Sequence, residues 1–168
     1  VQITESDMEI LKAKGVSVVT NPASNMKLGN GFAPVPEMLE KGINVCIGTD
    51  GAASNNSLNL FHEMSLLALI HKGVKKTPQC ISAAQNFRIA TINGAKALGL
   101  SEEIGSLEVG KKADIAILNL NTPSLTPRNN LLAGLSYSAN GSEVETVIID
   151  GKITMENRRV LTMDEEVV

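Results

Sequence analysis

INVCIGTDGAASN, residues 43–55, is the stretch that decides the fold class of this chain. Its first half, Ile43–Ile47, is apolar, rich in β-branched residues and bounded by Gly42 and Gly48, which predicts a short buried strand. Its second half is small and polar and carries one carboxylate, Asp50, just beyond the strand. Ligands and catalytic groups of parallel α/β folds lie at that end of their strands. Taken alone, Asp50 is more typical of a turn or a helix N-cap.

Helices and strands alternate in the sequence that leads up to this stretch. Thr4 has the features of a helix N-cap and Gly15 those of a helix stop, so a helix is expected between them. Residues 16–20 then predict a second buried strand, and Pro36 opens another helix that ends at Gly42. This order of helix, strand, helix, strand predicts parallel strands joined by crossover connections, and hence an α/β fold.

Residues 21–25 are predicted to form a loop between those elements, because Pro22 has no backbone N–H. Asn25 is a candidate binding residue in this loop. Its amide could bind a ligand, or it could hold the backbone of its own loop. Asparagines in loops more often do the second, and that interpretation is favoured here.

Besides short helices over residues 91–99 and 131–138, two helices are predicted beyond residue 56. The first covers residues 58–72, with Asn56 or Ser57 as its N-cap and Gly73 as its end. The second begins at Thr77, which precedes a proline.

His62 and His71, the only histidines, both lie on the first of these helices, nine positions apart. Histidines that share a metal on one helix face are typically three or four positions apart. They are therefore expected to be surface or packing residues.

The last third of the chain has the pattern of β structure. Residues 104–118 predict two short strands joined by a turn at residues 110–112, and residues 144–155 predict a hairpin. The turn of that hairpin, Asp150–Gly151, suits a type I′ geometry, in which both central residues have positive φ. Residues 162–165 could start a further helix.

Composition narrows the class of protein. The chain has 168 residues, 43% hydrophobic and 20% charged, which is typical of a folded soluble protein. Its net charge of −3 argues against nucleic acids or anionic membranes as partners, and no apolar run approaches the roughly 20 residues of a membrane helix. Cys46 and Cys80 have no metal-binding or redox spacing, so we expect buried free thiols and a cytoplasmic protein.

Two strings carry a resemblance to a known family. GTDGAASNN, residues 48–56, resembles the segment after the last barrel strand of amidohydrolase-superfamily deaminases, nearest the branch that acts on methylthioadenosine and S-adenosylhomocysteine. Residues 105–115 resemble the return of that family from its barrel into a small β-sandwich. The resemblance implies that residues 1–103 are the C-terminal portion of a (β/α)8 metal-dependent hydrolase barrel, and residues 104–168 part of a composite β-sandwich domain.

The size of such a barrel bears on what this chain represents. A complete barrel of this kind needs about 200 residues or more. The chain also starts at Val1 and passes at once into patterned sequence. We therefore expect it to be the C-terminal piece of a longer enzyme.

The resemblance also implies the chemistry. Asp50 would be a ligand of one divalent metal, zinc or iron, would handle the proton of the metal-bound water and would contact the substrate. Ser54 and Asn55 would shape or support this loop, and Asn25 would line the pocket mouth. The hydroxide would attack C6 of an adenine ring and release ammonia. The histidine ligands and catalytic glutamate of the family have no counterpart here, so the chain alone is expected to be inactive and free of tightly held metal.

The residues around Asp50 and the same resemblance also predict the substrate and the partners. Residues 51–53 are small enough to leave room for a purine, and residues 54–56 offer neutral hydrogen-bonding groups. The expected substrate is a purine nucleoside, handled by a homo-oligomer. A triazine hydrolase or a guanine deaminase would share Asp50 and differ in the loops. A non-catalytic α/β module, with residues 48–51 as a turn or an anion-binding nest, is a further alternative.

Overall fold

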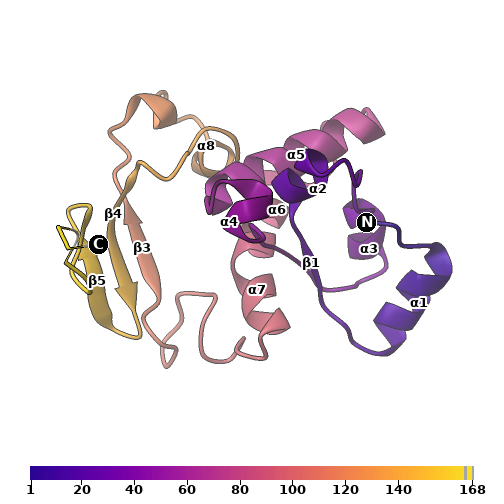
Figure 1. Ribbon diagram of the computed structural model, residues 1–168, viewed down its shortest axis with the longest axis horizontal. Helices are drawn as coiled ribbons and strands as arrows, with labels where there is room; N and C mark the ends of the chain where they lie inside the picture. Colours follow the sequence, from indigo (N-terminus) through magenta and orange to yellow (C-terminus); the bar gives the residue numbers. More distant parts are fainter. Residues whose placement is uncertain (165, 168) are drawn as a thin grey trace.

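The computed structural model describes residues 1–164, 166 and 167. Figure 1 shows helices around two short strands at the end of the molecule that holds the N-terminus, and an antiparallel sheet at the end that holds the C-terminus. The helical part contains α1 (Glu5–Ala13), β1 (Val18–Thr20), α2 (Pro22–Lys27), α3 (Val35–Glu40), β2 (Val45–Ile47), α4 (Ala52–Asn55), α5 (Leu60–Lys75), α6 (Ala83–Ala90) and α7 (Ile92–Ala97). The second part contains β3 (Ile115–Leu118), the 3₁₀ turn η1 (Pro123–Leu125), α8 (Leu131–Tyr137), β4 (Val144–Ile149), β5 (Lys152–Glu156) and β6 (Arg159–Val160).

The two strands of the helical part are parallel, as the order of elements predicts. Val18 pairs with Val45 and Thr20 with Ile47, and α2 and α3 make the crossover between them. The carboxyl ends of β1 and β2 therefore meet at one edge. The predicted N-cap of α1 is also confirmed, because the Thr4 side chain accepts a hydrogen bond from Asp7 N–H and the Asp7 carboxylate accepts one from Thr4 N–H.

The second sheet is antiparallel, with strand order β3-β4-β5-β6. The turn between β4 and β5 has φ of +49° at Asp150 and +75° at Gly151, which confirms the positive φ expected at both central residues.

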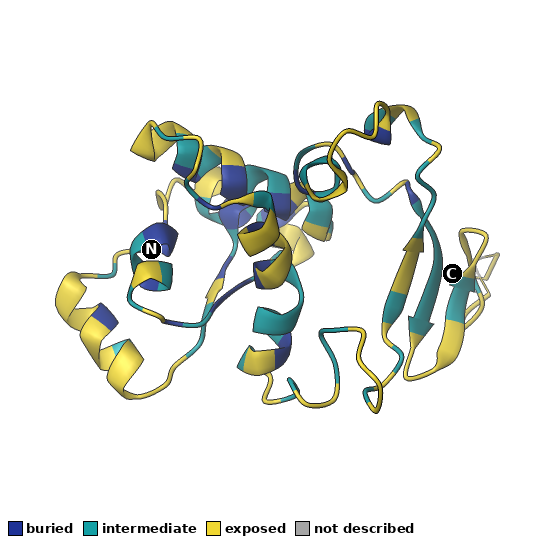
Figure 2. Cartoon of the chain, turned by 180° about the vertical axis from the view of Figure 1, so that it is seen from behind, coloured by how far each residue is buried: buried dark blue, intermediate teal, exposed yellow. Residues whose placement is uncertain are grey.

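The hydrophobic core lies in the helical part. Its buried residues come from α1, α3, α5, α6, β2 and the segments between them: Met8, Ala33, Val35, Met38, Ile43, Val45, Leu67, Ile81 and Ile89. Figure 2 shows buried positions gathered around α3, α5 and β2, whereas no strand position of the antiparallel sheet is buried. Cys46 is buried and Cys80 half-buried, and both are free thiols.

The structure corrects both ends of the helix predicted over residues 58–72. Asn59, not Asn56 or Ser57, is the N-cap of α5, and its side-chain oxygen accepts hydrogen bonds from two amides of the first turn. Asn56 has a left-handed φ of +71° and closes α4 instead. Gly73 does not end α5. The helix continues to Lys75, and Lys76 closes it with a left-handed φ of +52°. A glycine stops a helix only where the backbone turns left-handed, and Gly73 lies one turn too early.

Gly73→Ala is therefore expected to stabilise the chain by about 0.5–1 kcal/mol, because alanine loses less backbone entropy inside a helix. A Cβ at this position would meet no atom within 4 Å. Urea unfolding measures the change. Gly42→Ala is the matched control, since it also has open space but a φ of +78°, and it should destabilise. Equal effects of the two substitutions would contradict this placement of Gly73.

The loop predicted over residues 21–25 and the helix start predicted at Thr77 are also wrong. Residues 21–25 do not form a loop: α2 starts at Pro22, where the missing N–H costs nothing because the first amides of a helix have no partner in it. The second predicted helix does not begin at Thr77. α6 begins at Ala83, with Ser82 and Gln85 forming a capping box, because Ile81 just before it has a left-handed φ of +46°.

Residues 104–118 form one strand rather than two. β3 begins at Ile115, and the segment before it consists of turns, with Gly105 and Gly110 at φ near +90°. These left-handed glycines turn the backbone away from the extended conformation that a strand needs. The helix expected over residues 162–165 is not seen at Thr162 and Met163, which form bends, and Glu165 lies outside the described residues.

Candidate functional site

The candidate site lies at the edge where β1 and β2 end side by side. Beyond Thr20 the chain enters α2, and beyond Ile47 it passes through Gly48 to the loop that holds Asp50. Gly48 leaves room here for two side chains of the neighbouring segment. A Cβ on it would lie 2.6 Å from the side-chain oxygen of Asn21 and 3.0 Å from Cγ1 of Val19. A larger residue at this position would therefore have to displace the Asn21 amide and crowd Val19.

Asp50 projects from this edge with an exposed side chain and a left-handed φ of +60°, which aspartate tolerates better than most residues. Its Oδ2 accepts a hydrogen bond from Oγ of Ser24 at 2.7 Å, and its Oδ1 accepts one from Gly51 N–H at 2.7 Å. Within the described part of the chain, no ion pair includes Asp50.

Hydrogen bonds hold the pKa of the Asp50 carboxyl below its ordinary value. The Ser24 hydroxyl has the largest effect, followed by the Ser54 hydroxyl and the Gly51 amide. Ser54 Oγ also lies 3.0 Å from the Gly51 carbonyl, and its single hydrogen can point to only one of the two acceptors at a time. Asp50 is therefore ionised at neutral pH, and can bind a cation or accept a proton.

Asn55 is buried beneath this loop, with 9% of its surface exposed. Its Nδ2 donates to the Thr49 carbonyl at 2.5 Å and to Oε1 of Glu63 at 2.7 Å. The structure thus brings together three of the candidates named from the sequence: Asp50 lies in the turn after β2, whereas Ser54 and Asn55 lie not in a loop, as expected, but on the short helix α4 that follows it.

Glu63, on the first turn of α5, is a site residue that the sequence did not identify. It is fully buried, and its Oε2 accepts a hydrogen bond from Ala23 N–H on α2 at 3.0 Å. A signal was present, because an acidic residue one turn before Leu67 falls on the apolar face of the predicted helix. Burying a carboxylate at such a position raises the free energy of the folded protein unless the carboxylate is hydrogen-bonded.

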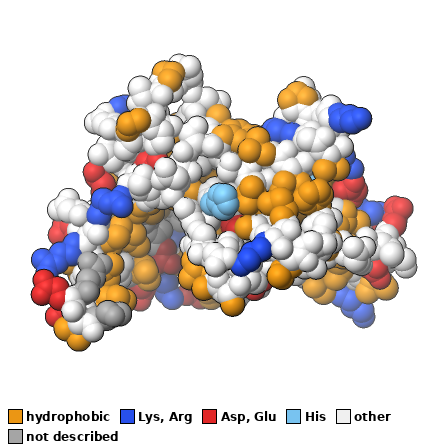
Figure 3. All heavy atoms as spheres, turned by 45° about the horizontal axis from the view of Figure 1, so that its top comes forward, with side chains coloured by type: hydrophobic (Ala, Val, Ile, Leu, Met, Phe, Trp, Pro, Cys, Tyr) orange, Lys and Arg blue, Asp and Glu red, His pale blue; other side chains and the backbone are white. Residues whose placement is uncertain are grey.

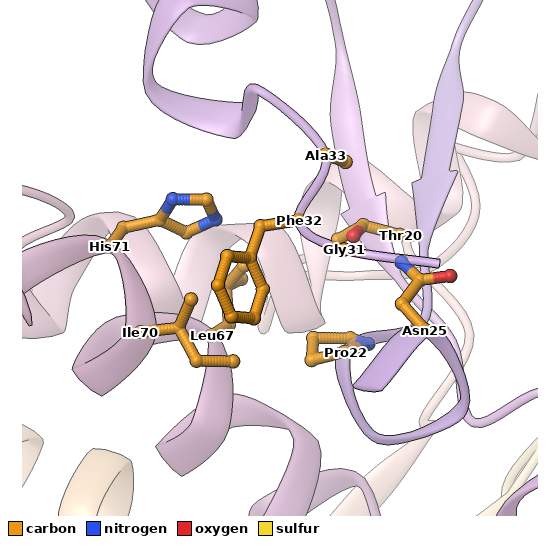
Figure 4. A pocket seen from close by; sticks show the side chains of 9 residues that line it. All are labelled: Thr20, Pro22, Asn25, Gly31, Phe32, Ala33, Leu67, Ile70 and His71. Atoms are coloured by element: carbon orange, nitrogen blue, oxygen red, sulfur yellow. The ribbon is translucent and has the colours of Figure 1, made fainter. Parts of the chain in front are cut away.

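Asn25, which follows Ser24 on α2, lines a small cavity between α2, residues 31–33 and α5 (Figure 4). The cavity volume is about 10 Å³, the room of a single water molecule. Figure 4 shows Asn25 and His71 on either side of Phe32. Asn25 donates its backbone N–H to Asn21 and accepts from Asn30 at its carbonyl. Among the described residues its side chain has no hydrogen bond, so the favoured interpretation, in which the Asn25 amide holds the backbone of its own loop, is not seen: Asn25 lies in α2, and only its backbone makes these bonds.

The two histidines occupy different environments, as expected for surface and packing residues. His62 is exposed, whereas His71 is buried against the cavity, and this burial lowers the pKa of its imidazole. In the part of the chain that the structure describes, no group of three or more His, Cys, Asp or Glu side chains could hold a metal ion. Asp50 is the candidate ligand that the structure places at the ends of β1 and β2.

Apolar side chains gather on the face shown in Figure 3, whereas charged side chains lie mostly toward its two ends. Leu28, Phe32 and Leu58 are among the large apolar residues with about half or more of their surface exposed.

Among the described residues, no helix has both the length and the apolar character that crossing a membrane requires.

Comparison with known proteins places the chain in a family. The chain is 53% identical over 168 residues to the 5-methylthioadenosine/S-adenosylhomocysteine deaminase of Acetivibrio thermocellus, and 52% identical to the 5'-deoxyadenosine deaminase of Methanosarcina acetivorans. Both matches cover the whole of this chain, which spans about two fifths of the length of these curated relatives: 39% of the first and 38% of the second.

Structural comparison gives the same answer. An adenosine deaminase from Xanthomonas campestris, solved with bound zinc, superposes with a TM-score of 0.95 at 39% identity, over 99% of this chain and 38% of that one. The sequence model of the amidohydrolase family matches residues 1–154. The chain is therefore a member of the amidohydrolase family.

Proposed function

We propose that the protein to which this chain belongs is a metal-dependent hydrolytic deaminase. It converts methylthioadenosine or S-adenosylhomocysteine to the corresponding inosyl product and ammonia. The observation that carries the proposal is the ionised, exposed Asp50 at the paired ends of β1 and β2, without a cationic partner among the described residues. Identity of 53% to a deaminase of these substrates, across the whole chain, supports this assignment.

The architecture proposed for the whole protein has two parts. Residues 1–103 form the last strands and helices of a (β/α)8 barrel, and residues 104–168 form the C-terminal part of a composite β-sandwich. The parallel pairing of β1 with β2 and the change to an antiparallel sheet at β3 support this division. The absence of buried positions in the strands of that sheet is also typical of a sheet that packs against further chain.

Asp50 fits the place of one ligand to a divalent cation. A carboxylate has about four lone-pair positions, and the hydrogen bonds from Ser24 and Gly51 occupy two of them. The proposed metal is zinc, the metal bound in the Xanthomonas campestris structure, with iron as the alternative. A bound metal of this kind lowers the pKa of a water ligand to near neutrality.

The residues of this chain have separate roles in the proposed reaction. Asp50 accepts a proton from the attacking water at a carboxylate oxygen and passes it to the leaving nitrogen. Ser24 and Gly51 hold that carboxylate in one orientation. Ser54 and Asn55 hold the loop, and Asn25 lines the neighbouring cavity.

Isolated residues 1–168 are proposed to be inactive and to hold no metal tightly, because one carboxylate is too few ligands for a catalytic site. The whole protein is proposed to be a cytoplasmic homo-oligomer that acts on small molecules and binds neither nucleic acid nor membrane. Free thiols at Cys46 and Cys80 support a reducing compartment, and exposed apolar side chains such as Val19 support association.

A second candidate substrate is 5'-deoxyadenosine, because a deaminase named for it is 52% identical to this chain. Both candidates carry the same adenine ring, so the site chemistry proposed for Asp50 is unchanged. They differ at the 5′ position, which a substrate panel can distinguish.

The proposal is tested by following the absorbance change from adenine to hypoxanthine with the whole protein. Methylthioadenosine and S-adenosylhomocysteine are expected to be turned over. 5'-Deoxyadenosine, guanine and a chlorotriazine are assayed in parallel. Turnover of guanine or the triazine, with every adenosyl compound untouched, would refute the assignment. The isolated 168-residue chain is the control, and activity or about one zinc or iron per chain in it would contradict the view of Asp50 as a lone ligand.

A further inference from the structure

Glu63 is a buried acidic residue at the point where the two segments around Asp50 meet. Its side chain is 0% exposed, and none of the ion pairs within the described residues includes it. A buried carboxylate without a cation persists only when hydrogen bonds replace its lost water. Glu63 has two such bonds, one from each segment: Oε2 accepts from Ala23 N–H and Oε1 accepts from Asn55 Nδ2.

Each of these bonds ends close to a group that holds Asp50. Ala23 is followed by Ser24, whose hydroxyl donates to Oδ2 of Asp50. Asn55 donates with the same Nδ2 to the carbonyl of Thr49, the residue before Asp50. The carboxylate of Glu63, on α5, is therefore hydrogen-bonded to α2 through Ala23 and to Asn55, which in turn holds the carbonyl of Thr49. These partners lie far apart in the sequence.

This support matters because Asp50 has a left-handed backbone, with φ of +60°. Residues in such sparsely populated conformations persist where the surrounding structure holds them from several sides. Ala23 also lies in the first turn of α2, where amides have no partner within the helix, so Glu63 satisfies a donor that the helix leaves without one.

We propose that Glu63 is the positioning residue for Asp50: its carboxylate sets the orientation of the Asp50 side chain through Ala23–Ser24 and through Asn55–Thr49. The proposal rests on the proposed function, in which Asp50 is a metal ligand and proton acceptor. Glu63 itself is buried away from substrate and acts only through these neighbours.

Glu63→Gln is the sharpest variant, because glutamine has nearly the same shape but one acceptor oxygen and one NH₂ group. Both partners of Glu63 are donors, so the NH₂ of glutamine must face one of them and that hydrogen bond is lost. Glu143→Gln is the matched control. Glu143 is also 0% exposed and accepts bonds from Ser124 Oγ, Asn140 N–H and Gly141 N–H. None of these partners lies in residues 20–28 or 48–56.

The experiment uses the whole protein with either variant and has three readouts. Hydrogen–deuterium exchange of residues 20–28 and 48–56 requires neither metal nor substrate. The visible spectrum of the Co²⁺-loaded protein reports the geometry around Asp50. The rate constant kcat for methylthioadenosine is expected to fall by about 10–100-fold in Glu63→Gln, the usual loss when a group that orients a metal ligand is removed.

Glu63→Gln is expected to speed exchange in both segments, to change the Co²⁺ spectrum and to lower kcat with a smaller change in KM. Glu143→Gln is expected to leave all three near the values of the unmodified protein, even if it lowers Tm. Unchanged exchange and spectrum in Glu63→Gln would overturn the proposal, as would equal changes in both variants. If the unmodified protein turns over no adenosyl compound, the proposed function fails, and the exchange experiment still decides whether Glu63 holds the Asp50 loop.

Discussion

Asp50→Asn in the whole protein is expected to lower kcat by about 10²–10⁴-fold, the usual contribution of one general acid–base group. The amide is nearly isosteric with the carboxylate, so Tm should change little. It is neutral, however, and a poor proton acceptor, and it binds a divalent cation more weakly. Steady-state kinetics with methylthioadenosine and metal analysis of the dialysed protein measure the two losses. The metal content should fall together with kcat.

His62→Gln is the control for this substitution. His62 is exposed on α5, and its side chain has no hydrogen bond among the described residues. Its replacement should leave kcat within about twofold, since substitutions at exposed positions without specific contacts have small effects. A loss of activity as large as that of Asp50→Asn would show that a histidine of α5 takes part in the chemistry, and would contradict the site described above.

Leu67→Ala is expected to destabilise the protein by about 2–5 kcal/mol, the usual cost of removing a buried leucine side chain. Leu67 is 1% exposed and lies in the core cluster with Val45 of β2 and Ile89 of α6. The cavity left by the substitution would remove packing contacts between α5 and the rest of this core cluster. Urea unfolding measures the loss of stability.

Leu69→Ala, two residues away on the same helix, is the matched control because Leu69 is 54% exposed. It should change the free energy of unfolding by no more than about 0.5 kcal/mol. If the two substitutions destabilised equally, α5 would not pack on the core through the face that holds Leu67.

Local patterns in the sequence were enough to predict most of the elements. The apolar runs of β1 and β2, the capping box at Thr4 and the Asp150–Gly151 turn depend on neighbouring residues, and all are present in the structure. The errors arose where one residue type has two uses. Pro22 can end an element or begin a helix, and Gly73 can stop a helix or lie within it. The choice depends on the backbone conformation, which packing decides.

Only part of the candidate site could be predicted from the sequence, for the same reason. Asp50 was found because it follows a strand that the local sequence predicts and because its string resembles a known family. Nothing in that string shows that Ser24, 26 positions earlier, donates to its carboxylate. Ser54 and Asn55 were named from their position in the loop, and the hydrogen bonds that they make became visible only in the folded chain.

The sequence by itself thus determined the alternation of α1, β1, α3 and β2, the parallel pair that this alternation implies, and Asp50 at the end of β2, because these follow from patterns among near neighbours. Only the tertiary structure decided which groups hold Asp50 in place. The Glu63 carboxylate accepts a hydrogen bond from the Ala23 N–H, 40 positions away in the sequence. This bond forms because β1 and β2 end at one edge and α5 packs close to it. A buried carboxylate finds its donors in three dimensions, and no local pattern encodes which ones they are.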